Sequence, residues 1–300
     1  MKKLRYDLTI FLILLLGLAL WQIATVHTNA INIKKDFAAF QPQKNTAIFA
    51  AYSADHTVPN YVITYLRALK EIAPNIIYIT DNPIRKNEIK KLAPFITRIE
   101  ALHHGEYDWG SYKRGVNWLQ NNNYLSQTDK LILANDSTLL VAPSLTPIME
   151  AMPDQADFYG ITANQDGLYH LQSYFLVFKP QVYQKREFLS YLNNVKAQKD
   201  GLTVAYRYEV PFTQYLENLG FHSASYIPYK KLSSLPLNDK NCYPLTMLAT
   251  YHTPLLKLRT FTQRLNIQEP KRLVLEWLKK NAPQAYSDLL QHFSSAILQK

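Results

Sequence analysis

Residues 46–80 read TAIFAAYSADHTVPNYVITYLRALKEIAPNIIYIT and contain the pattern that decides the fold. The runs at 46–52 and 75–80 are short and apolar, which is typical of buried strands. Between these runs, apolar residues recur at helical spacing, at Val62, Tyr65, Leu66 and Leu69. Two strands joined by a helix lie parallel in a sheet, so this stretch predicts the first unit of an α/β domain.

The same alternation continues as far as residue 226. Further strands are predicted at 95–102, 130–134, 157–162, 170–178 and 221–226. Helices are predicted at 58–73, 83–92, 110–120, 144–152, 180–195 and 204–219. This order predicts a mostly parallel central sheet that is flanked by helices on both faces, as in Rossmann-like folds.

The composition of the 300-residue chain limits both its structure and its partners. With 47% hydrophobic residues, the chain can bury a large core, which excludes disorder as its main state. Its single cysteine, Cys242, excludes an internal disulfide and a cysteine-rich zinc site. The net charge of +10 favours anionic surroundings such as phosphate-bearing ligands or a membrane surface. The basic residues are spread along the chain without a recognition motif, so no nucleic-acid partner is expected.

The N-terminus predicts a membrane anchor. No charged residue interrupts the chain from Leu8 to Val26, a run close to the roughly 20 apolar residues of a membrane-spanning helix. The competing interpretation is a signal peptide that is cleaved near Ala30. Basic residues flank the run on both sides, at Lys2, Lys3, Arg5, Lys34 and Lys35. The first three favour a cytoplasmic tail and the last two oppose it, so a single-pass protein of the bacterial inner membrane is expected with the side of its domain undecided.

We therefore divide the chain into four parts. Residues 1–26 are expected to form a cytoplasmic tail and membrane anchor, 27–45 a linker, 46–240 the α/β domain and 241–300 a helical C-terminal region without strands. A basic amphipathic helix is predicted at 270–281, and it either packs on the domain or lies against anionic lipid.

Polar residues follow the predicted strands at their carboxyl ends, where open parallel sheets bind ligands. Tyr52 and Ser53 follow the first strand, and Asn135, Asp136 and Ser137 follow the strand at 130–134. Asp136 is therefore a candidate ligand for magnesium or manganese that bridges a diphosphate. The alternative is a turn with Asx capping.

The segment GEYDWGSYKRG at 105–115 is the second candidate for donor binding. Gly110 is expected to open a helix with free backbone N–H groups, which bind anions. Lys113 and Arg114 then lie in the first turn, where they meet phosphate charge. The alternative is an ordinary helix start with a buried Trp109.

Six separated motifs, in this order, resemble the rhamnan synthesis F family of polysaccharide-building glycosyltransferases. They are GEYDWGSYKRG at 105–115, LILANDS at 131–137, DFYGITAN at 157–164, HLQSYFLVF at 170–178, YEVPFTQYLENLGF at 208–221 and PLLKLRTF at 254–261. The similarity covers residues 46–262. The N-terminal span is not a usual part of the resemblance.

The resemblance implies a GT-A-like fold and transfer of rhamnose or a related hexose from a nucleotide-sugar donor to a cell-surface or lipid-linked glycan. Asn135, Asp136 and Ser137 stand where other GT-A enzymes carry an Asp-X-Asp metal motif. The first carboxylate of that motif is missing, which leaves dependence on a divalent metal open. The alternative function is a catalytically silent carbohydrate-binding or scaffold subunit of a polysaccharide assembly complex.

Glycosyl transfer also needs a base for the acceptor hydroxyl. The candidates are Glu209, Asp166 and His170, and the resemblance places Glu209 first. Asp166 is by default part of a hairpin turn, and His170 is by default a hydrogen-bonded strand residue. Asp108, in the GEYDWGSYKRG segment, is expected to accept hydrogen bonds from a ribose or a base of the donor.

Overall fold

The computed structural model describes residues 29–262 and 266–293. The predicted membrane anchor at 8–26 lies outside these residues. Within the described ranges, every helix is too short or too polar to span a bilayer.

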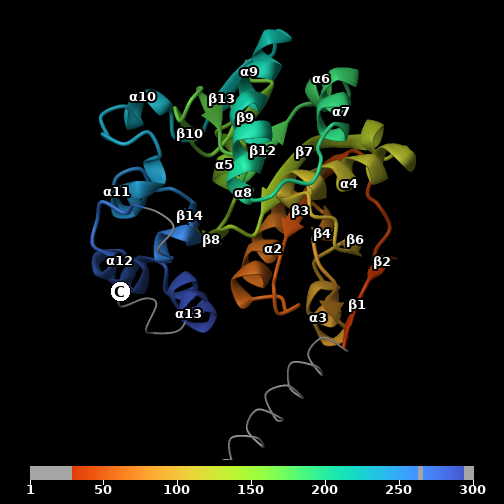
Figure 1. The fold of residues 1–300 in the computed structure, drawn as a ribbon, viewed down its shortest axis with the longest axis horizontal. Helices are drawn as coiled ribbons and strands as arrows, with labels where there is room; N and C mark the ends of the chain where they lie inside the picture. Colours follow the sequence, from red (N-terminus) through yellow and green to blue (C-terminus); the bar gives the residue numbers. More distant parts are fainter. Residues whose placement is uncertain (1–28, 263–265, 294–300) are drawn as a thin grey trace, which may run out of the picture.

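An eight-stranded sheet forms the centre of the molecule (Figure 1). Its spatial order is β13-β9-β12-β7-β3-β4-β6-β2. The strands are β2 (Ile33–Asp36), β3 (Lys44–Ala51), β4 (Asn75–Thr80), β6 (Arg98–Ala101), β7 (Thr128–Asn135), β9 (Phe158–Gly160), β12 (Phe175–Phe178) and β13 (Ser223–Ser225). The predicted α/β class and the helix-flanked central sheet are confirmed.

The strand directions differ from the predicted mostly parallel sheet. Strands β7, β3, β4 and β6 run parallel, as do β13 and β9. Strand β12 runs antiparallel to both of its neighbours, and β2 runs antiparallel to β6, so the sheet is mixed. The reason is the connection from β9 to β12, which contains only the short strands β10 (Ala163–Asn164) and β11 (His170–Leu171) and no crossover helix.

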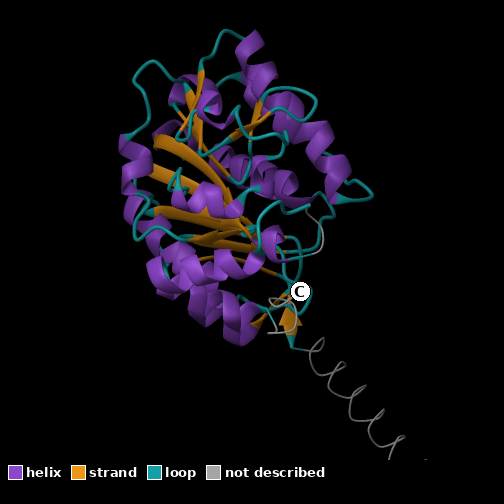
Figure 2. Ribbon diagram, turned by 90° about the vertical axis from the view of Figure 1, so that its left-hand side faces the viewer, coloured by secondary structure: helices purple, strands orange, loops and turns teal. Residues whose placement is uncertain are grey.

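Helices cover both faces of the sheet (Figure 2). The longer ones are α2 (Asn60–Ile72), α3 (Lys86–Leu92), α4 (Tyr107–Asn121), α7 (Arg186–Asn193), α9 (Val210–Asn218), α12 (Lys271–Asn281) and α13 (Pro283–His292). Short helices are α5 (Thr146–Glu150), α6 (Pro180–Tyr183), α8 (Gly201–Val204), α10 (Tyr229–Leu232) and α11 (Pro244–Ala249). A π-helical turn at Ala205–Glu209 links α8 to α9.

Strand β3 separates two hydrophobic cores because its side chains alternate between the two faces of the sheet. Ala47 and Phe49 contribute to the core under α2, α12 and α13. Ile48 and Ala50 contribute to the core under α4, α7 and α9. Gly115 lets α4 approach β3 closely, since a Cβ at this position would lie 2.6 Å from Cγ2 of Ile48.

The predicted boundaries at 27–45 and 241–300 need correction. Strand β2 pairs with β6, and β1 (Ala30–Ile31) pairs with β5 (Ile84–Arg85), so the expected linker contributes to the folded domain. The C-terminal region also contains a strand, β14 (Leu255–Lys257), which pairs with β8 (Thr138–Leu140).

The basic helix predicted at 270–281 is observed as α12, and it packs on the domain. Val274 and Leu278 of α12 are buried in the core that also contains α2 residues. Of the two predicted arrangements, packing on the domain is therefore the one observed for this helix.

Candidate functional site

The site is built where β3 and β7 end side by side. The backbone N–H of Asp136 donates to the carbonyl of Ala50 (3.1 Å), which continues the pairing of the two strands. The N–H of Tyr52 donates to Oδ2 of Asp136 (2.8 Å). The hydroxyl of Tyr61, on α2, donates to the Asp136 carbonyl (3.1 Å). The residue after β3 thus holds the Asp136 carboxylate at this edge, and the start of α2 holds its backbone.

Asn135 forms the Asx turn that the sequence offered as an alternative. Its Oδ1 accepts hydrogen bonds from Ser137 N (3.2 Å) and Ser137 Oγ (2.6 Å). Its Nδ2 donates to Oδ2 of Asp108 (3.1 Å), at the start of α4. The turn therefore connects the end of β7 to the carboxylate of Asp108.

Ser173 connects Asp108 to Glu209. Its backbone N–H donates to Oε1 of Glu209 (3.0 Å), and its hydroxyl lies 3.5 Å from Oδ2 of Asp108. Ser173 precedes β12 and is buried. Three carboxylates from α4, the end of β7 and the π-helical turn therefore meet in one region. We call Asp108, Asp136 and Glu209 the carboxylate cluster.

Two carboxylates of the cluster are hard to ionise. Burial and the neighbouring charge of Glu209 raise the pKa of Asp108 to about 6. Burial raises the pKa of Asp136 to about 7, although the hydrogen bond from Tyr52 opposes this change. The charge of Asp108 raises the pKa of Asp136 further. Perturbed carboxylates that share a charge environment are typical of functional sites.

Lys257 is the cation at the cluster, and no sequence argument assigned it a role. Pairing of β14 with β8 places Lys257 opposite Thr138. Its Nζ donates to Ser137 Oγ (3.0 Å) and lies 4.5 Å from the ring centroid of Tyr174. Burial and the charge of Arg259 lower the pKa of Lys257 to about 8, against the opposing effect of the carboxylates. The only sequence signal for it was its position within the PLLKLRTF motif.

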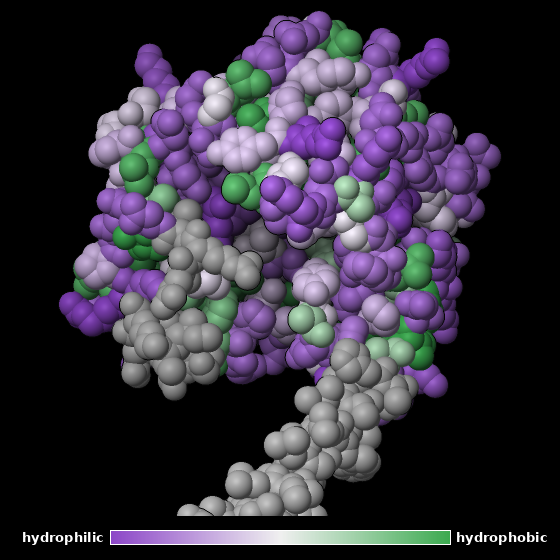
Figure 3. Space-filling view, viewed as in Figure 1, coloured by the Kyte–Doolittle hydropathy of each residue, from purple (hydrophilic) through white to green (hydrophobic). Residues whose placement is uncertain are grey.

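The surface is hollowed near the middle of one face, between α8 and α2 (Figure 3). Tyr52 lies beside Asp136 and is 60% exposed, so this part of the site is open to solvent. Ser53 next to it donates from its hydroxyl to Asp55 Oδ1 (2.5 Å) and from its N–H to Asn82 Oδ1 (3.1 Å). Tyr52 therefore contributes to the site through its backbone, and Ser53 supports the loop.

Lys113 and Arg114 do not extend toward the carboxylate cluster as free cations. Lys113 Nζ lies 2.6 Å from Oε1 of Glu106, and Arg114 Nη1 lies 2.6 Å from Oε2 of the same side chain. Lys113 also donates to the carbonyl of Val195 (2.8 Å). We call Glu106, Lys113 and Arg114 the paired group. This pairing reduces the charge that the two cations offer to a donor phosphate, and their binding of phosphate stays a prediction.

The start of α4 is also occupied by protein. Oδ1 of Asp81 accepts hydrogen bonds from the N–H groups of His104 (2.5 Å) and Gly105 (2.9 Å), and its Oδ2 accepts one from Tyr107 (3.4 Å). The helix begins at Tyr107, and the N–H of Gly110 donates to Glu106 O (3.0 Å). Gly110 therefore lies inside the helix and offers no free N–H to an anion.

The other predicted site residues make no side-chain hydrogen bond to the cluster, although the backbone N–H of Trp109 donates to Oδ1 of Asp108 (3.0 Å). Trp109 is 1% exposed and packs in the core, as the alternative interpretation had it. Asp166 is exposed and accepts a hydrogen bond from the Tyr206 hydroxyl (3.2 Å). His170 is buried in β11, with Nδ1 2.8 Å from the carbonyl of Leu168. Of the three candidate bases, the structure brings only Glu209 to Asp108.

The donor atoms can be compared with the needs of magnesium or manganese. Within the described residues, no three His, Cys, Asp or Glu side chains form a group that could hold a metal ion. The amide oxygen of Asn135 is engaged by Ser137. Asp108 and Asp136 remain, and one or two carboxylates suffice for Mg²⁺ when substrate phosphates complete its shell. The residues thus fit a metal that enters together with a diphosphate.

A family model described as rhamnan synthesis protein F matches residues 76–299 of this chain. The chain belongs to the rhamnan synthesis protein F family. The matched region contains the whole carboxylate cluster and Lys257. The family resemblance seen in the six motifs is confirmed. No curated protein matches the sequence of this family member.

Several solved structures are similar to this rhamnan synthesis F protein at low identity. The glycosyltransferase GlyE of Streptococcus pneumoniae TIGR4 is 9% identical over 85% of this chain and 64% of its own, with a TM-score of 0.44. A 4-diphosphocytidyl-2C-methyl-D-erythritol synthase is 14% identical over 62% and 90%, with a TM-score of 0.40. Core-mannan synthase A of Aspergillus fumigatus, in its Mn/GDP form, is 10% identical over 63% and 73%, with a TM-score of 0.35.

Proposed function

We propose that this protein is a glycosyltransferase that moves a sugar from a nucleotide-diphosphate donor to a glycan acceptor. The observation that carries the proposal is the carboxylate cluster with Lys257 at the strand ends, within the region that matches the rhamnan synthesis F family. The family description makes activated rhamnose, or a related hexose, the first donor to test. A cell-surface or lipid-linked glycan is the corresponding acceptor.

Glu209 is the proposed base. One of its oxygens accepts the N–H of Ser173, and no described residue donates a hydrogen bond to the other oxygen. That free oxygen takes the proton of the acceptor hydroxyl. The hydroxyl oxygen then bonds to the anomeric carbon, and the bond from this carbon to the diphosphate breaks with its electron pair on the diphosphate.

The diphosphate gains negative charge as it leaves, and Lys257 supplies a positive charge for it. The hydrogen bond to Ser137 and the contact with the Tyr174 ring hold the ammonium beside Asp136. A magnesium or manganese ion, when bound by Asp136 and Asp108, would add a second positive charge at the phosphate oxygens. Asp108 also accepts a hydrogen bond from the Asn135 amide, which orders the turn at the end of β7.

We also propose that residues 8–26 anchor the enzyme in the bacterial inner membrane, on sequence evidence alone. Both basic residues that oppose a cytoplasmic tail have contacts in the folded domain. Lys34 pairs with Glu100 (3.2 Å), and Lys35 lies 5.0 Å from the ring of Phe37. A topology reporter fused after Lys300 would show on which side the domain lies.

The test of the function uses the full chain and a panel of nucleotide sugars, with and without magnesium or manganese. We expect saturable binding of one donor, transfer of its sugar to a glycan, and donor binding about tenfold weaker in Asp136→Ala. Asp166→Ala is the matched control, because it removes an exposed aspartate outside the cluster. Unchanged affinity in Asp136→Ala would remove the proposed diphosphate site. Glycan binding without donor binding or transfer would identify a silent carbohydrate-binding subunit instead.

A further inference from the structure

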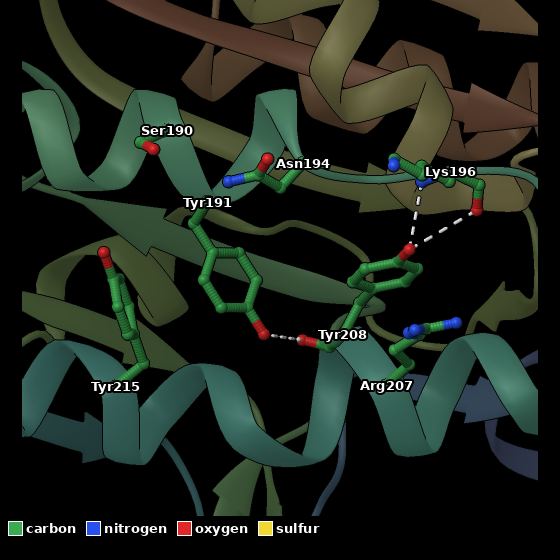
Figure 4. Close-up of a pocket in the computed structure, with 7 residues that line it drawn as sticks. All are labelled: Ser190, Tyr191, Asn194, Lys196, Arg207, Tyr208 and Tyr215. Carbon is green, nitrogen blue, oxygen red and sulfur yellow. Dashed lines mark hydrogen bonds between the residues drawn. The ribbon is translucent and has the colours of Figure 1, made fainter.

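A pocket of about 420 Å³ lies between α7 and the π-helical turn at Ala205–Glu209 (Figure 4). Its volume falls in the roughly 300–1,000 Å³ range of small-molecule sites. Three tyrosines, Tyr191, Tyr208 and Tyr215, contribute aromatic rings to its lining. None of the carboxylate cluster residues lines it, so this pocket is distinct from the proposed catalytic site.

The tyrosine hydroxyl groups are already engaged. Tyr191 donates to the carbonyl of Tyr208 (2.9 Å), and Tyr215 donates to the carbonyl of Glu187 (3.1 Å). The Tyr208 hydroxyl accepts the backbone N–H of Lys196 (3.0 Å). Figure 4 shows Tyr191 and Tyr208 held by these bonds. The rings are therefore fixed in place, and they present aromatic surface to a ligand instead of free hydroxyl groups.

The polar side chains of the lining, in contrast, make few hydrogen bonds to other described residues. The side chains of Ser190, Asn194 and Lys196 are exposed, and they make no hydrogen bond to any described residue. Arg207 makes a single bond, from Nη1 to Oε1 of Gln198 (3.2 Å). No carboxylate lines the pocket, whereas the two cationic side chains of Lys196 and Arg207 do, which disfavours a cationic ligand.

Fixed aromatic rings beside free amide, hydroxyl and cationic donors suit a saccharide. The C–H face of a sugar ring packs against an aromatic ring, while its hydroxyl groups need hydrogen-bond partners at the edge of the contact. Neutral sugars and sugars with an acidic substituent both match this lining, because it carries two cations and no anion.

The pocket is joined to the carboxylate cluster through two pairs of consecutive residues. Tyr208 lines the pocket and Glu209 belongs to the cluster, within one π-helical turn. Asp108 belongs to the cluster, and the ring of the next residue, Trp109, lies 6.0 Å from Tyr191 and 6.4 Å from Tyr208. π-Helical turns occur frequently at functional sites. A ligand in the pocket would therefore contact Tyr208, the residue that directly precedes Glu209.

We propose that this pocket is a glycan-binding subsite that holds a sugar residue of the acceptor chain away from the reacting hydroxyl. The identity of the ligand as acceptor glycan rests on the proposed function.

The test compares Tyr215→Ala with Tyr215→Phe in the full chain, using a rhamnose oligosaccharide as the probe and calorimetry or ligand-observed NMR to measure Kd. Loss of the ring in Tyr215→Ala should raise the Kd roughly 2- to 10-fold. Tyr215→Phe keeps the ring but loses the hydrogen bond to the Glu187 carbonyl, so its Kd should lie closer to the wild-type value than that of Tyr215→Ala does. Asn194→Ala, on an exposed position, should also weaken binding, and it provides the answer if Tyr215→Ala does not fold.

An equal Kd in wild type, Tyr215→Ala and Asn194→Ala would overturn the proposal. Loss of nucleotide-sugar binding in Tyr215→Ala, with glycan binding unchanged, would overturn it as well, because the pocket would then belong to the donor. If the chain transfers no sugar and still loses glycan affinity in Tyr215→Ala, the glycan pocket stands and the transferase proposal fails.

Discussion

Glu106 and Asp108 lie two positions apart at the start of α4, yet the pKa values of their carboxyl groups are shifted in opposite directions. Burial alone would raise the pKa of Glu106. The hydrogen bonds from Lys113 and Arg114 nevertheless hold this pKa below its usual value. Burial and Glu209 raise the pKa of Asp108 to about 6. In the paired group two cations surround one carboxylate, whereas in the carboxylate cluster three carboxyl groups lie near one ammonium, that of Lys257. We therefore expect the paired group to support the fold and the carboxylate cluster to carry the proposed chemistry.

The largest expected effect separates the two groups by activity. Glu209→Gln keeps an oxygen for the Ser173 N–H but removes the base, so we expect the transfer rate at saturating substrates to fall about 10²- to 10⁴-fold. Glu106→Gln is the matched change in the paired group and should lower the rate far less. A similar loss in both variants would mean that the two groups do not differ in role.

The stability of the folded protein should depend on the charge of Glu106 in the paired group. Glu106→Gln leaves Lys113 and Arg114 with a neutral partner in a partly buried position, so we expect the free energy of unfolding to fall by about 1–3 kcal/mol. Urea denaturation of the full chain in a suitable detergent, followed by circular dichroism, measures this change. Stability equal to that of the wild type would show that the pairing contributes nothing to the fold.

The pH dependence of the transfer reaction tests whether the Lys257 ammonium at the carboxylate cluster is needed for activity. Below its pKa of about 8 the ammonium is charged, and activity should fall as pH rises through that value. Lys257→Arg stays charged at pH 9 and should retain about tenfold more of its neutral-pH activity there than the wild type does. The kcat/KM profile from pH 5 to 10 tests this point. An alkaline limb that persists in Lys257→Arg would assign it to another group.

The smallest expected effect concerns the energetic penalty of the cluster itself. A carboxyl group whose pKa is raised on folding binds more protons in the folded state between its unfolded and folded pKa values. Its contribution to stability therefore falls as pH rises from about 4 to 6. Asp108→Asn removes this penalty and should stabilise the protein at pH 7 by on the order of 1 kcal/mol. Thermal unfolding at pH 4.5 and pH 7 checks the sign, and a destabilised variant at pH 7 would contradict it.

The sequence predicted the part of the site that depends on strand ends. Asp136 follows an apolar strand directly, and the rule that parallel strands end at one edge was enough to place it beside Tyr52. Asp108 was also singled out, and the Asn135 amide does join it to the end of β7. The predicted positions agree with the structure because they used only local pattern and sheet direction, while the roles of these residues in donor and metal binding stay predictions.

Two features were not predicted, each for its own physical reason. The paired group escaped prediction because α4 begins at Tyr107 and not at Gly110, which brings Glu106 within reach of Lys113 and Arg114. Helix boundaries are the least certain part of sequence-based assignment. Strand β2 escaped because most of its residues are exposed, so it lacks a clear apolar alternation.

Lys257 could not be found from local pattern, because it reaches Ser137 across 120 residues of sequence. The pairing of β14 with β8 that brings it there involves three residues on each strand. The dependence of the site on Lys257 also has a consequence for biosynthesis. A ribosome makes the sheet and all three carboxylates before it makes β14, so a nascent chain that stops short of Leu255 has the acidic half of the site without its ammonium. Under the proposed mechanism such fragments would be poor at cleaving activated sugars, and activity would begin only after β14 has been made and has paired with β8.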